Sequence, residues 1–271
     1  MNDTLSPSDP TPARAPMQVA TFHSLRGRRV FVTGGGSGIG AAIVEAFARQ
    51  GAHVAFVDVA EGASAELAGR LRGEGLATPW WRACDVRDIA ALQAAIADAA
   101  QALGGDFHAL VNNVASDDRH TLESVTPDYW DDRMAINERP AFFAIQAVVP
   151  GMRRLGGGAI VNLGSTGWQT KAAEYPCYAI AKSSVNGLTR GLAASLGRDR
   201  IRINTVSPGW VMTQRQLEKW LTPEGEQAIA RNQCLPDKLQ PDEIARMVLF
   251  LASDDGRACT AQEFKVDAGW S

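Results

Sequence analysis

Three side chains at defined spacing could carry proton-transfer chemistry. Tyr178 and Lys182 are four residues apart on a predicted helix, so the phenol ring and the ammonium group share one helix face. A free tyrosine ionises at about pH 10, which is too high for a base at neutral pH. A nearby ammonium group, together with a positively charged nicotinamide ring, favours the phenolate and brings the group into working range. Ser165 ends a predicted strand upstream and could hydrogen-bond the reacting oxygen.

A glycine-rich stretch, TGGGSGIG at residues 33–40, lies between a predicted strand and a predicted helix. Glycines there allow a tight turn and a close approach of the backbone to a pyrophosphate, whose charge meets free N–H groups and the helix dipole. The same stretch could be a flexible turn, but the strand before it and the helix after it favour cofactor binding. The residues expected at the cofactor are Gly34, Ser37, Gly38, Ile39 and Gly40.

Acidic residues follow the second and third predicted strands. Asp58 is placed to accept hydrogen bonds from the adenosine ribose hydroxyls, although it could also cap a turn. Its carboxylate would repel a 2′-phosphate, and neither Ser37 nor its neighbour Val59 supplies a cation, so NAD is predicted over NADP. Asp85 and Val86 end the third strand, where Asp85 could meet the adenine amino group or N-cap the next helix.

Short β-branched runs alternate with longer Ala- and Leu-rich stretches. Strands are predicted at 29–33, 53–57, 80–84, 109–114, 159–163, 202–206 and 264–266, and helices at 38–50, 63–72, 88–103, 128–149, 178–196 and 242–252. This alternation predicts an α/β fold with a Rossmann-type, doubly wound parallel sheet of about seven strands in a single domain. Ligands bind such sheets beyond the carboxyl ends of the strands, where every candidate residue lies.

Composition excludes several classes of function. The net charge of −3 and the absence of a long basic run favour neither nucleic acid nor an anionic membrane. Residues 1–24 are rich in Pro, Ser and Thr and too polar for a signal peptide, so they are predicted to be a disordered arm before a catalytic domain at 25–271. The four scattered cysteines indicate reduced thiols in a cytoplasmic protein, with no disulfide framework and no metal site.

Taken together, these motifs resemble the short-chain dehydrogenase/reductase family from about residue 25 to the C-terminus. The resemblance rests on TGGGSGIG at 33–40, the Asn112-Asn113 pair, Asn137, Ser165, Tyr178, Lys182 and Pro208-Gly209. It implies that Asn112 belongs to the cofactor site. It also implies that residues 208–213 contact the nicotinamide carboxamide and lead into the substrate loop. The cofactor residues implied in that segment are Pro208, Gly209, Val211 and Thr213.

The resemblance further implies a catalytic tetrad of Asn137, Ser165, Tyr178 and Lys182. In the family, the tyrosine is the base or acid and the serine holds the substrate oxygen. The lysine binds the nicotinamide ribose and tunes the tyrosine, and the asparagine anchors a water molecule that connects the lysine to solvent.

Two positions depart from the family pattern. Ala115 stands where the family usually has glycine, which could tighten the nicotinamide pocket but removes no catalytic group. Pro140 lies inside the predicted helix at 128–149 and is expected to kink it and free nearby carbonyl groups. A freed carbonyl beside Asn137 would suit a water relay, whereas the alternative is a bend that serves packing alone. The sequence does not decide between them.

The expected substrate pocket combines carboxylate, amide and indole groups. Residues 117–120 (DDRH) follow the fourth strand, Trp168 and Gln169 follow Ser165, and Trp210 follows the Pro-Gly pair. Such a pocket suits a small polyol, because hydroxyls pair with acids and the C–H face of a sugar packs on an aromatic ring. Alternatively, residues 117–120 form a solvated loop with an internal ion pair. The predicted substrate residues are Asp117, Ser165, Trp168, Gln169, Tyr178 and Trp210.

Further stretches resemble the bacterial aldose 1-dehydrogenases of the family, among them the D-xylose and L-arabinose enzymes. These stretches are SPGWVMTQRQ at 207–216, QCL at 233–235, LFLASDD at 249–255 and the terminal VDAGW. The resemblance implies oxidation of a pyranose at its anomeric carbon to the aldonolactone. L-Arabinose or D-galactose is expected first, then D-xylose or L-fucose.

Two alternatives and one assembly prediction complete this interpretation. A reductase for a 3-oxoacyl thioester, or for another alcohol or ketone, would need a long apolar substrate loop, but residues 214–225 are mostly polar. A catalytically silent cofactor-binding sensor is disfavoured because the tetrad is intact. Apolar outer stripes are expected on the helices at 128–149 and 178–196, and the family resemblance then implies a homotetramer.

Overall fold

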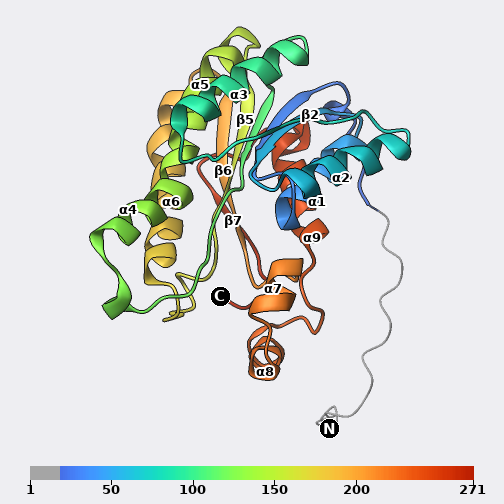
Figure 1. Ribbon diagram of the computed structural model, residues 1–271. Helices are drawn as coiled ribbons and strands as arrows, with labels where there is room; N and C mark the ends of the chain where they lie inside the picture. Colours follow the sequence, from blue (N-terminus) through green and yellow to red (C-terminus); the bar gives the residue numbers. More distant parts are fainter. Residues whose placement is uncertain (1–18) are drawn as a thin grey trace.

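The computed structural model describes residues 19–271 (Figure 1). All seven strands are parallel and form one sheet in the order β3-β2-β1-β4-β5-β6-β7. They are β1 (Arg29–Thr33), β2 (His53–Asp58), β3 (Trp80–Ala83), β4 (Ala109–Asn112), β5 (Gly158–Leu163), β6 (Ile201–Pro208) and β7 (Glu263–Val266). The predicted doubly wound parallel sheet in a single domain is confirmed. Its strand order reverses between β1 and β4, the place where such sheets bind ligands.

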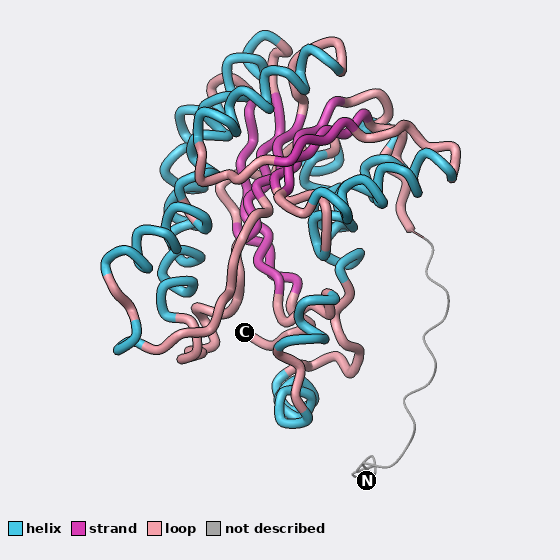
Figure 2. Tube along the Cα trace, viewed as in Figure 1, coloured by secondary structure: helices cyan, strands magenta, loops and turns pink. Residues whose placement is uncertain are grey.

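Helices cover both faces of the sheet (Figures 1 and 2). One face packs against α1 (Gly38–Arg49), α2 (Glu61–Gly73) and α9 (Pro241–Ala252), and the other against α3 (Ile89–Ala102), α5 (Arg139–Arg154) and α6 (Pro176–Gly197). Alternate residues of each strand enter opposite cores: Val30 and Val32 point into one, and Phe31 points into the other. The strands are apolar throughout because both of their faces are buried.

The helix predicted at 128–149 is in fact two helices. The chain leaves helical geometry at Glu138 (φ −128°, ψ −60°), which separates α4 (Pro127–Asn137) from α5. Pro140 lies in the first turn of α5, where the N–H that proline lacks would have no helical partner. The expected kink within one helix is therefore wrong. Proline marks a helix start, and α4 ends with Asn137 at its last position.

Two short helices were not predicted. They are α7 (Gln214–Lys219) and α8 (Pro223–Asn232), which lie beyond the carboxyl ends of the strands in Figure 1. Thr213 and Thr222 begin them, because each threonine side chain accepts a hydrogen bond from a backbone N–H of the first turn. Both helices carry few buried residues, so they lack the apolar periodicity that would have predicted them.

The N-terminal boundary differs from the prediction. A disordered arm was predicted at 1–24, and residues 1–18 of it lie outside the described residues. The rest of that segment packs on the domain: the Phe22 N–H donates to Gln50 Oε1 at 2.7 Å, and Ser24 Oγ accepts from the Asp254 N–H at 3.0 Å. Ordered structure thus begins before residue 25. Among residues 19–271, no helix has the length and apolar character needed to cross a membrane.

Candidate active site

The glycine turn (residues 33–40) connects β1 to α1. Gly34 and Gly38 have positive φ angles of 69° and 55°, which favour glycine. A Cβ atom on Gly40 would lie 1.7 Å from the Gly34 carbonyl oxygen, so only glycine allows α1 to pack this closely on the turn. Ser37 is the N-cap of α1 but makes no side-chain cap hydrogen bond. The first N–H groups of α1, including that of Ile39, are therefore available to an anionic ligand.

Asp58 has one of the two roles that the sequence left open for the end of β2, that of capping a turn. Its Oδ2 accepts from the Gly36 N–H at 2.8 Å, and its Oδ1 accepts from the Ala60 N–H at 2.9 Å. The carboxylate thus caps the turn after β2 and holds the glycine turn beside it. Val59 is 69% exposed at the same edge. Contact of Asp58 and Val59 with a ribose stays a prediction, and their position next to the glycine turn is compatible with it.

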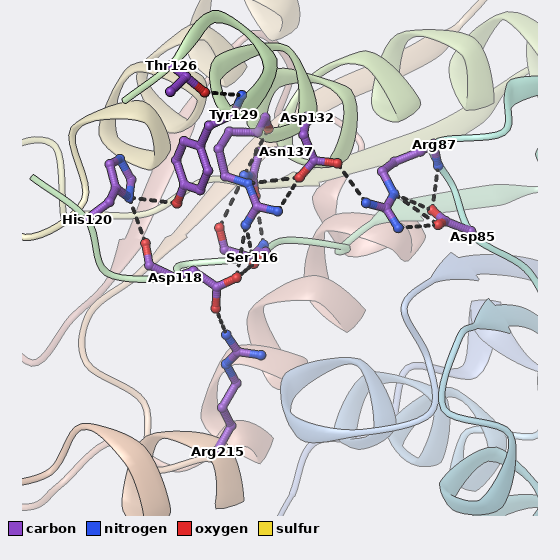
Figure 3. A network of polar contacts seen from close by, with 11 residues as sticks. Asp85, Arg87, Ser116, Asp118, His120, Thr126, Tyr129, Asp132, Asn137 and Arg215 are labelled. Atoms are coloured by element: carbon purple, nitrogen blue, oxygen red, sulfur yellow. Dashed lines mark hydrogen bonds and ion pairs between the residues drawn. The ribbon is translucent and has the colours of Figure 1, made fainter. Parts of the chain in front are cut away.

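Asp85 is not the cap of α3. The N-cap is Asp88, whose side chain accepts from a backbone N–H in the first turn, so the N-cap alternative for Asp85 is wrong. Asp85 instead pairs with Arg87 at 2.5 Å, and Arg87 also contacts Asp132 at 2.7 Å (Figure 3). Val86 is buried against the sheet. A contact with adenine stays a prediction for both residues.

Tyr178 and Lys182 lie on α6, which begins at Pro176. Lys182 is 3% exposed, its Nζ donates to the Leu163 carbonyl at 2.7 Å, and Nζ lies 5.9 Å from the centre of the Tyr178 ring. The ring and the ammonium group therefore share one helix face, as their spacing predicted. Ser165 follows β5, and its Oγ accepts from the Gly167 N–H at 3.0 Å.

Burial dominates the ionisation of the two central groups. It raises the pKa of Tyr178, although the Ser165 hydroxyl acts in the opposite direction, and Asp117 raises this pKa further. Burial also lowers the pKa of the Lys182 ammonium to about 8. Removal from water penalises both charged forms. The prediction that the ammonium and a positively charged nicotinamide ring together bring the phenol into working range stays a prediction.

Asn137 holds the loop that follows β4. Its Oδ1 accepts from the Ser116 N–H at 2.8 Å, and its Nδ2 donates to the Ser116 carbonyl at 3.1 Å (Figure 3). The side chain is 4% exposed. Both of its polar atoms are thus used inside the protein, and they fix the backbone that leads into residues 117–120.

A small cavity lies between Asn137 and Lys182. Its volume is about 20 Å³, enough for one water molecule, and Pro140 forms part of its wall. Asn112 also lines it, donating to Asn162 Oδ1 at 2.8 Å, while the Asn112 Oδ1 atom is buried without a partner among the described residues. The geometry is compatible with the water relay expected at the Pro140 break, because a water here would meet polar groups on several sides.

Residues 117–120 form a partly buried loop, in which the Asp118 side chain is 49% exposed. Asp117 and Arg119 have side chains only 19% and 25% exposed, although the ion pair suggested between them is present at 3.5 Å. Asp118 accepts from Arg133 at 3.0 Å and from Arg215 at 2.5 Å, which connects the loop to α4 and α7 (Figure 3). His120 Nε2 accepts from the Cys177 N–H at 3.0 Å, which ties the loop to the first turn of α6.

Three side chains meet beside α7: Asp117, Trp210 and Gln216. They are here named the substrate cluster, after the role that the sequence predicted for Asp117 and Trp210. Asp117 Oδ2 accepts from Gln216 Nε2 at 2.7 Å, and Trp210 Nε1 donates to Gln216 Oε1 at 2.9 Å. The structure thus brings together two predicted substrate residues through Gln216, which sequence reasoning missed. The only signal for it was the polar character of residues 214–225.

Trp168 and Gln169, also predicted at the substrate, have other surroundings. Trp168 is 37% exposed. The Gln169 amide donates to Glu263 on β7 at 3.1 Å, so the structure does not bring Gln169 together with the substrate cluster. Tyr175, at the start of α6, was missed: its ring lies 5.3 Å from the Tyr178 ring.

The segment at 208–213 approaches the glycine turn, and its contact with a nicotinamide carboxamide stays a prediction. A Cβ atom on Gly38 would lie 3.3 Å from Thr213 Cγ2. Val211 is 4% exposed and bridges to Leu239, and a Cβ atom on Gly209 would lie 2.8 Å from Asp267 Cα. Pro208 ends β6. This segment thus runs from the end of the sheet past the cofactor turn and into α7.

Comparison with known proteins agrees with this geometry. A family model described as enoyl-(acyl carrier protein) reductase matches residues 34–271. A D-xylose 1-dehydrogenase of Caulobacter vibrioides is 47% identical over 94% of this chain and 100% of its own length. A probable galactose dehydrogenase of Rhizobium meliloti is 47% identical over 92% of this chain and 96% of its own length.

Among solved structures, a 7α-hydroxysteroid dehydrogenase complexed with NADH and 7-oxo glycochenodeoxycholic acid matches with a TM-score of 0.86 at 29% identity. The match covers 92% of this chain and 96% of that one. The sheet order, the glycine turn and the Tyr178–Lys182 pair have the arrangement that the sequence motifs implied. The chain therefore belongs to the short-chain dehydrogenase/reductase family, whose dehydrogenases are oxidoreductases that bind a nicotinamide cofactor.

Proposed function

We propose that this protein is an NAD-dependent aldose 1-dehydrogenase that oxidises the anomeric carbon of a pyranose to the aldonolactone. The observation that carries the proposal is the substrate cluster, in which a carboxylate, an amide and an indole are joined by hydrogen bonds of 2.7 and 2.9 Å. Such a surface offers hydrogen bonds to hydroxyls and an aromatic face to sugar C–H groups. The relatives named for D-xylose and galactose act on substrates of this class.

In the proposed reaction, the C1–H and O–H bonds of the sugar break. The hydride and the proton that they release go to two different acceptors. Tyr178 removes the proton of the C1 hydroxyl, while Ser165 hydrogen-bonds that oxygen. The cofactor supplies the acceptor for the hydride that leaves C1, and the product is the lactone. Because burial raises the pKa of Tyr178, its ionisation depends on positive charge that the protein alone does not provide.

Lys182 and the small cavity provide the proposed exit for the proton. Lys182 lines the cavity together with Asn112 and Asn137. A water molecule there would satisfy the unpartnered Asn112 Oδ1 and accept a proton passed on by Lys182. Pro140, in the first turn of α5, contributes one wall of this site.

The residues of the glycine turn fit a dinucleotide. The uncapped N–H groups at the start of α1 would meet the pyrophosphate, and Asp58 would accept hydrogen bonds from the adenosine ribose. The Asp58 carboxylate lies directly against the glycine turn, bonded to the Gly36 N–H at 2.8 Å, where a 2′-phosphate would be repelled. NAD is therefore preferred over NADP in this proposal.

We also propose a homotetramer acting in the cytoplasm. Trp130, Phe142 and Ile180 are 38%, 45% and 47% exposed on α4, α5 and α6, which lie together on one flank in Figure 1. Apolar groups on adjoining helices favour burial against further copies of the chain. The four cysteines are free, which suits a reducing compartment.

Initial rates test the proposal. L-Arabinose, D-galactose, D-xylose and L-fucose are compared with NAD and with NADP, and lactone is identified as the product. We expect NADH formation, fastest with L-arabinose or D-galactose, and a kcat/KM for NAD at least about tenfold above that for NADP. Cofactor binding without turnover of any sugar would favour the silent sensor, and turnover of a 3-oxoacyl thioester instead would favour the reductase.

A further inference from the structure

Tyr175 is held beside the proposed base by the same helix. It is the N-cap residue of α6, so the backbone turn that starts the helix fixes both phenols. The Tyr175 and Tyr178 rings meet edge to face, with centroids 5.3 Å apart and an interplanar angle of 81°. Edge-to-face packing is a favoured geometry for aromatic pairs and restricts the rotation of both rings.

The Tyr175 hydroxyl also lies close to Ser165. A Cβ atom added to Gly167 would be 2.9 Å from Tyr175 Oη and 3.2 Å from Ser165 Oγ, so the two oxygens border the same small space. A side chain at position 167 would fill that space. The glycine therefore leaves a second hydroxyl exposed beside the serine that is proposed to hold the reacting oxygen.

Arg119 fixes the Tyr175 ring from its face. The guanidinium carbon lies 4.4 Å from the centre of the Tyr175 ring and 4.7 Å from the centre of the Trp220 ring. Arg119 is held in turn by the Asp117 carbonyl, to which it donates at 3.2 Å. Cation–π attraction between this guanidinium and the two rings places the phenol without using its hydroxyl.

That hydroxyl has no hydrogen-bond partner among residues 19–271, and it is not one of the buried unpaired atoms, so it remains accessible to a bound molecule. Tyr129, by contrast, places its hydroxyl 3.0 Å from His120 Nδ1. A hydroxyl that is held in place through its ring, has no protein partner and borders Ser165 is free to hydrogen-bond a substrate group.

We propose that the Tyr175 hydroxyl recognises the substrate hydroxyl at C2, next to the carbon that is oxidised. The proposal rests on the aldose 1-dehydrogenase activity, which puts O1 between Ser165 and Tyr178 and therefore O2 within reach of Tyr175. D-Xylose, D-galactose and L-arabinose share one configuration at C2 and differ at C4 or C5. A residue that recognises O2 thus suits all three sugars and disfavours their C2 epimers.

The test compares each sugar with an analogue that lacks O2. The values of kcat/KM are measured for D-galactose and 2-deoxy-D-galactose, and for D-xylose and 2-deoxy-D-xylose, with wild type and Tyr175→Phe. We expect the substitution to lower kcat/KM about 10- to 100-fold for the parent sugars and less than about 2-fold for the 2-deoxy sugars. The preference for D-xylose over its C2 epimer D-lyxose should fall by a similar factor.

Two further variants separate recognition from structure. Tyr129→Phe removes the hydroxyl that contacts His120 and should affect a sugar and its 2-deoxy analogue by the same factor. Arg119→Lys keeps the charge but removes the flat group between the two rings, so its loss should again be larger for the parent sugar. Thermal unfolding confirms that each variant is folded.

If Tyr175→Phe lowers kcat/KM equally for a sugar and its 2-deoxy analogue, or for neither, the assignment of Tyr175 to O2 is overturned. The dehydrogenase proposal would remain intact. If wild type oxidises none of the four sugars, the proposed function fails, and the role of Tyr175 fails with it.

Discussion

The glycine turn and the substrate cluster lie at the same end of the sheet, but their residues come from very different distances along the chain. The turn is one continuous segment, and the Asp58–Gly36 hydrogen bond that supports it joins residues 22 apart. The Gln216–Asp117 hydrogen bond joins residues 99 apart, and Arg215 and Asp118 are 97 apart. The glycine turn is therefore determined locally, whereas the substrate cluster depends on the whole fold.

The helices beside the two regions also differ in how many of their residues are buried. Helix α1, which follows the glycine turn, has five buried residues, among them Ile43, Val44 and Phe47. Helix α7 has none, and α8 has only Ile229. Elements with few buried apolar contacts open at low free-energy cost. The helix that follows the glycine turn is thus part of the core, whereas the helices beside Asp117, Trp210 and Gln216 form a polar layer over it.

The largest effect is expected when the proposed base, Tyr178, is removed. This residue serves both the glycine turn and the substrate cluster. Tyr178→Phe should lower kcat by about 10³-fold or more, because the phenol hydroxyl that takes the proton is lost. The Kd for NAD should change less than about twofold, as measured by calorimetry. A loss of NAD affinity as large as the loss of rate would show that Tyr178 binds cofactor rather than moving a proton.

The Lys182→Arg substitution tests whether the buried Lys182 ammonium couples the glycine turn to the substrate cluster. Burial lowers the pKa of Lys182 to about 8, so its ammonium is present below that pH and is lost above it. The pH profile of kcat/KM between pH 6 and 10 should show this ionisation in wild type. In Lys182→Arg the cation persists throughout, so the inflection near pH 8 should disappear, with kcat lower by about 10²-fold. An unchanged inflection would assign it to another group.

Substitution of Asp58 tests the glycine turn alone. Asp58→Ala removes both the proposed ribose acceptor and the support of the Gly36 N–H, and should weaken NAD binding about 10- to 100-fold. The NAD to NADP ratio of kcat/KM should narrow as well, since the repelling charge is gone. Asp58→Asn keeps an acceptor oxygen for the turn, so it should narrow the ratio with a smaller loss of affinity. A ratio that neither variant moves would place the ribose elsewhere.

The smallest effect is expected in the polar layer. Gln216→Leu breaks the hydrogen bonds to Asp117 and Trp210 and should raise the KM for sugar about tenfold while leaving the Kd for NAD unchanged. Gln214→Ala, on the same helix but bonded to Glu218, serves as the matched control and should change neither constant. If Gln216→Leu weakens NAD binding as much as sugar binding, the two regions are not separable as described.

Several features of the site could be predicted because their causes are local. The helical repeat alone puts Tyr178 and Lys182 on one face, and the glycines at 33–40 permit the tight turn wherever the strand and helix lie. Local rules also failed in places. Pro140 correctly indicated a disturbed helix, but proline restricts geometry both inside a helix and at its start, so the separation of α4 from α5 could not be derived.

The sequence by itself determined the order of the seven strands, the glycine turn and the shared helix face of Tyr178 and Lys182, because dihedral preferences and residue periodicity act over a few positions. Only the tertiary structure decided that Gln216 joins Asp117 to Trp210, that Tyr175 lies beside Ser165, and that burial rather than the neighbouring ammonium dominates the pKa of Tyr178. Those outcomes depend on which distant segments meet and how much water they exclude, and neither is encoded in any short stretch of the chain.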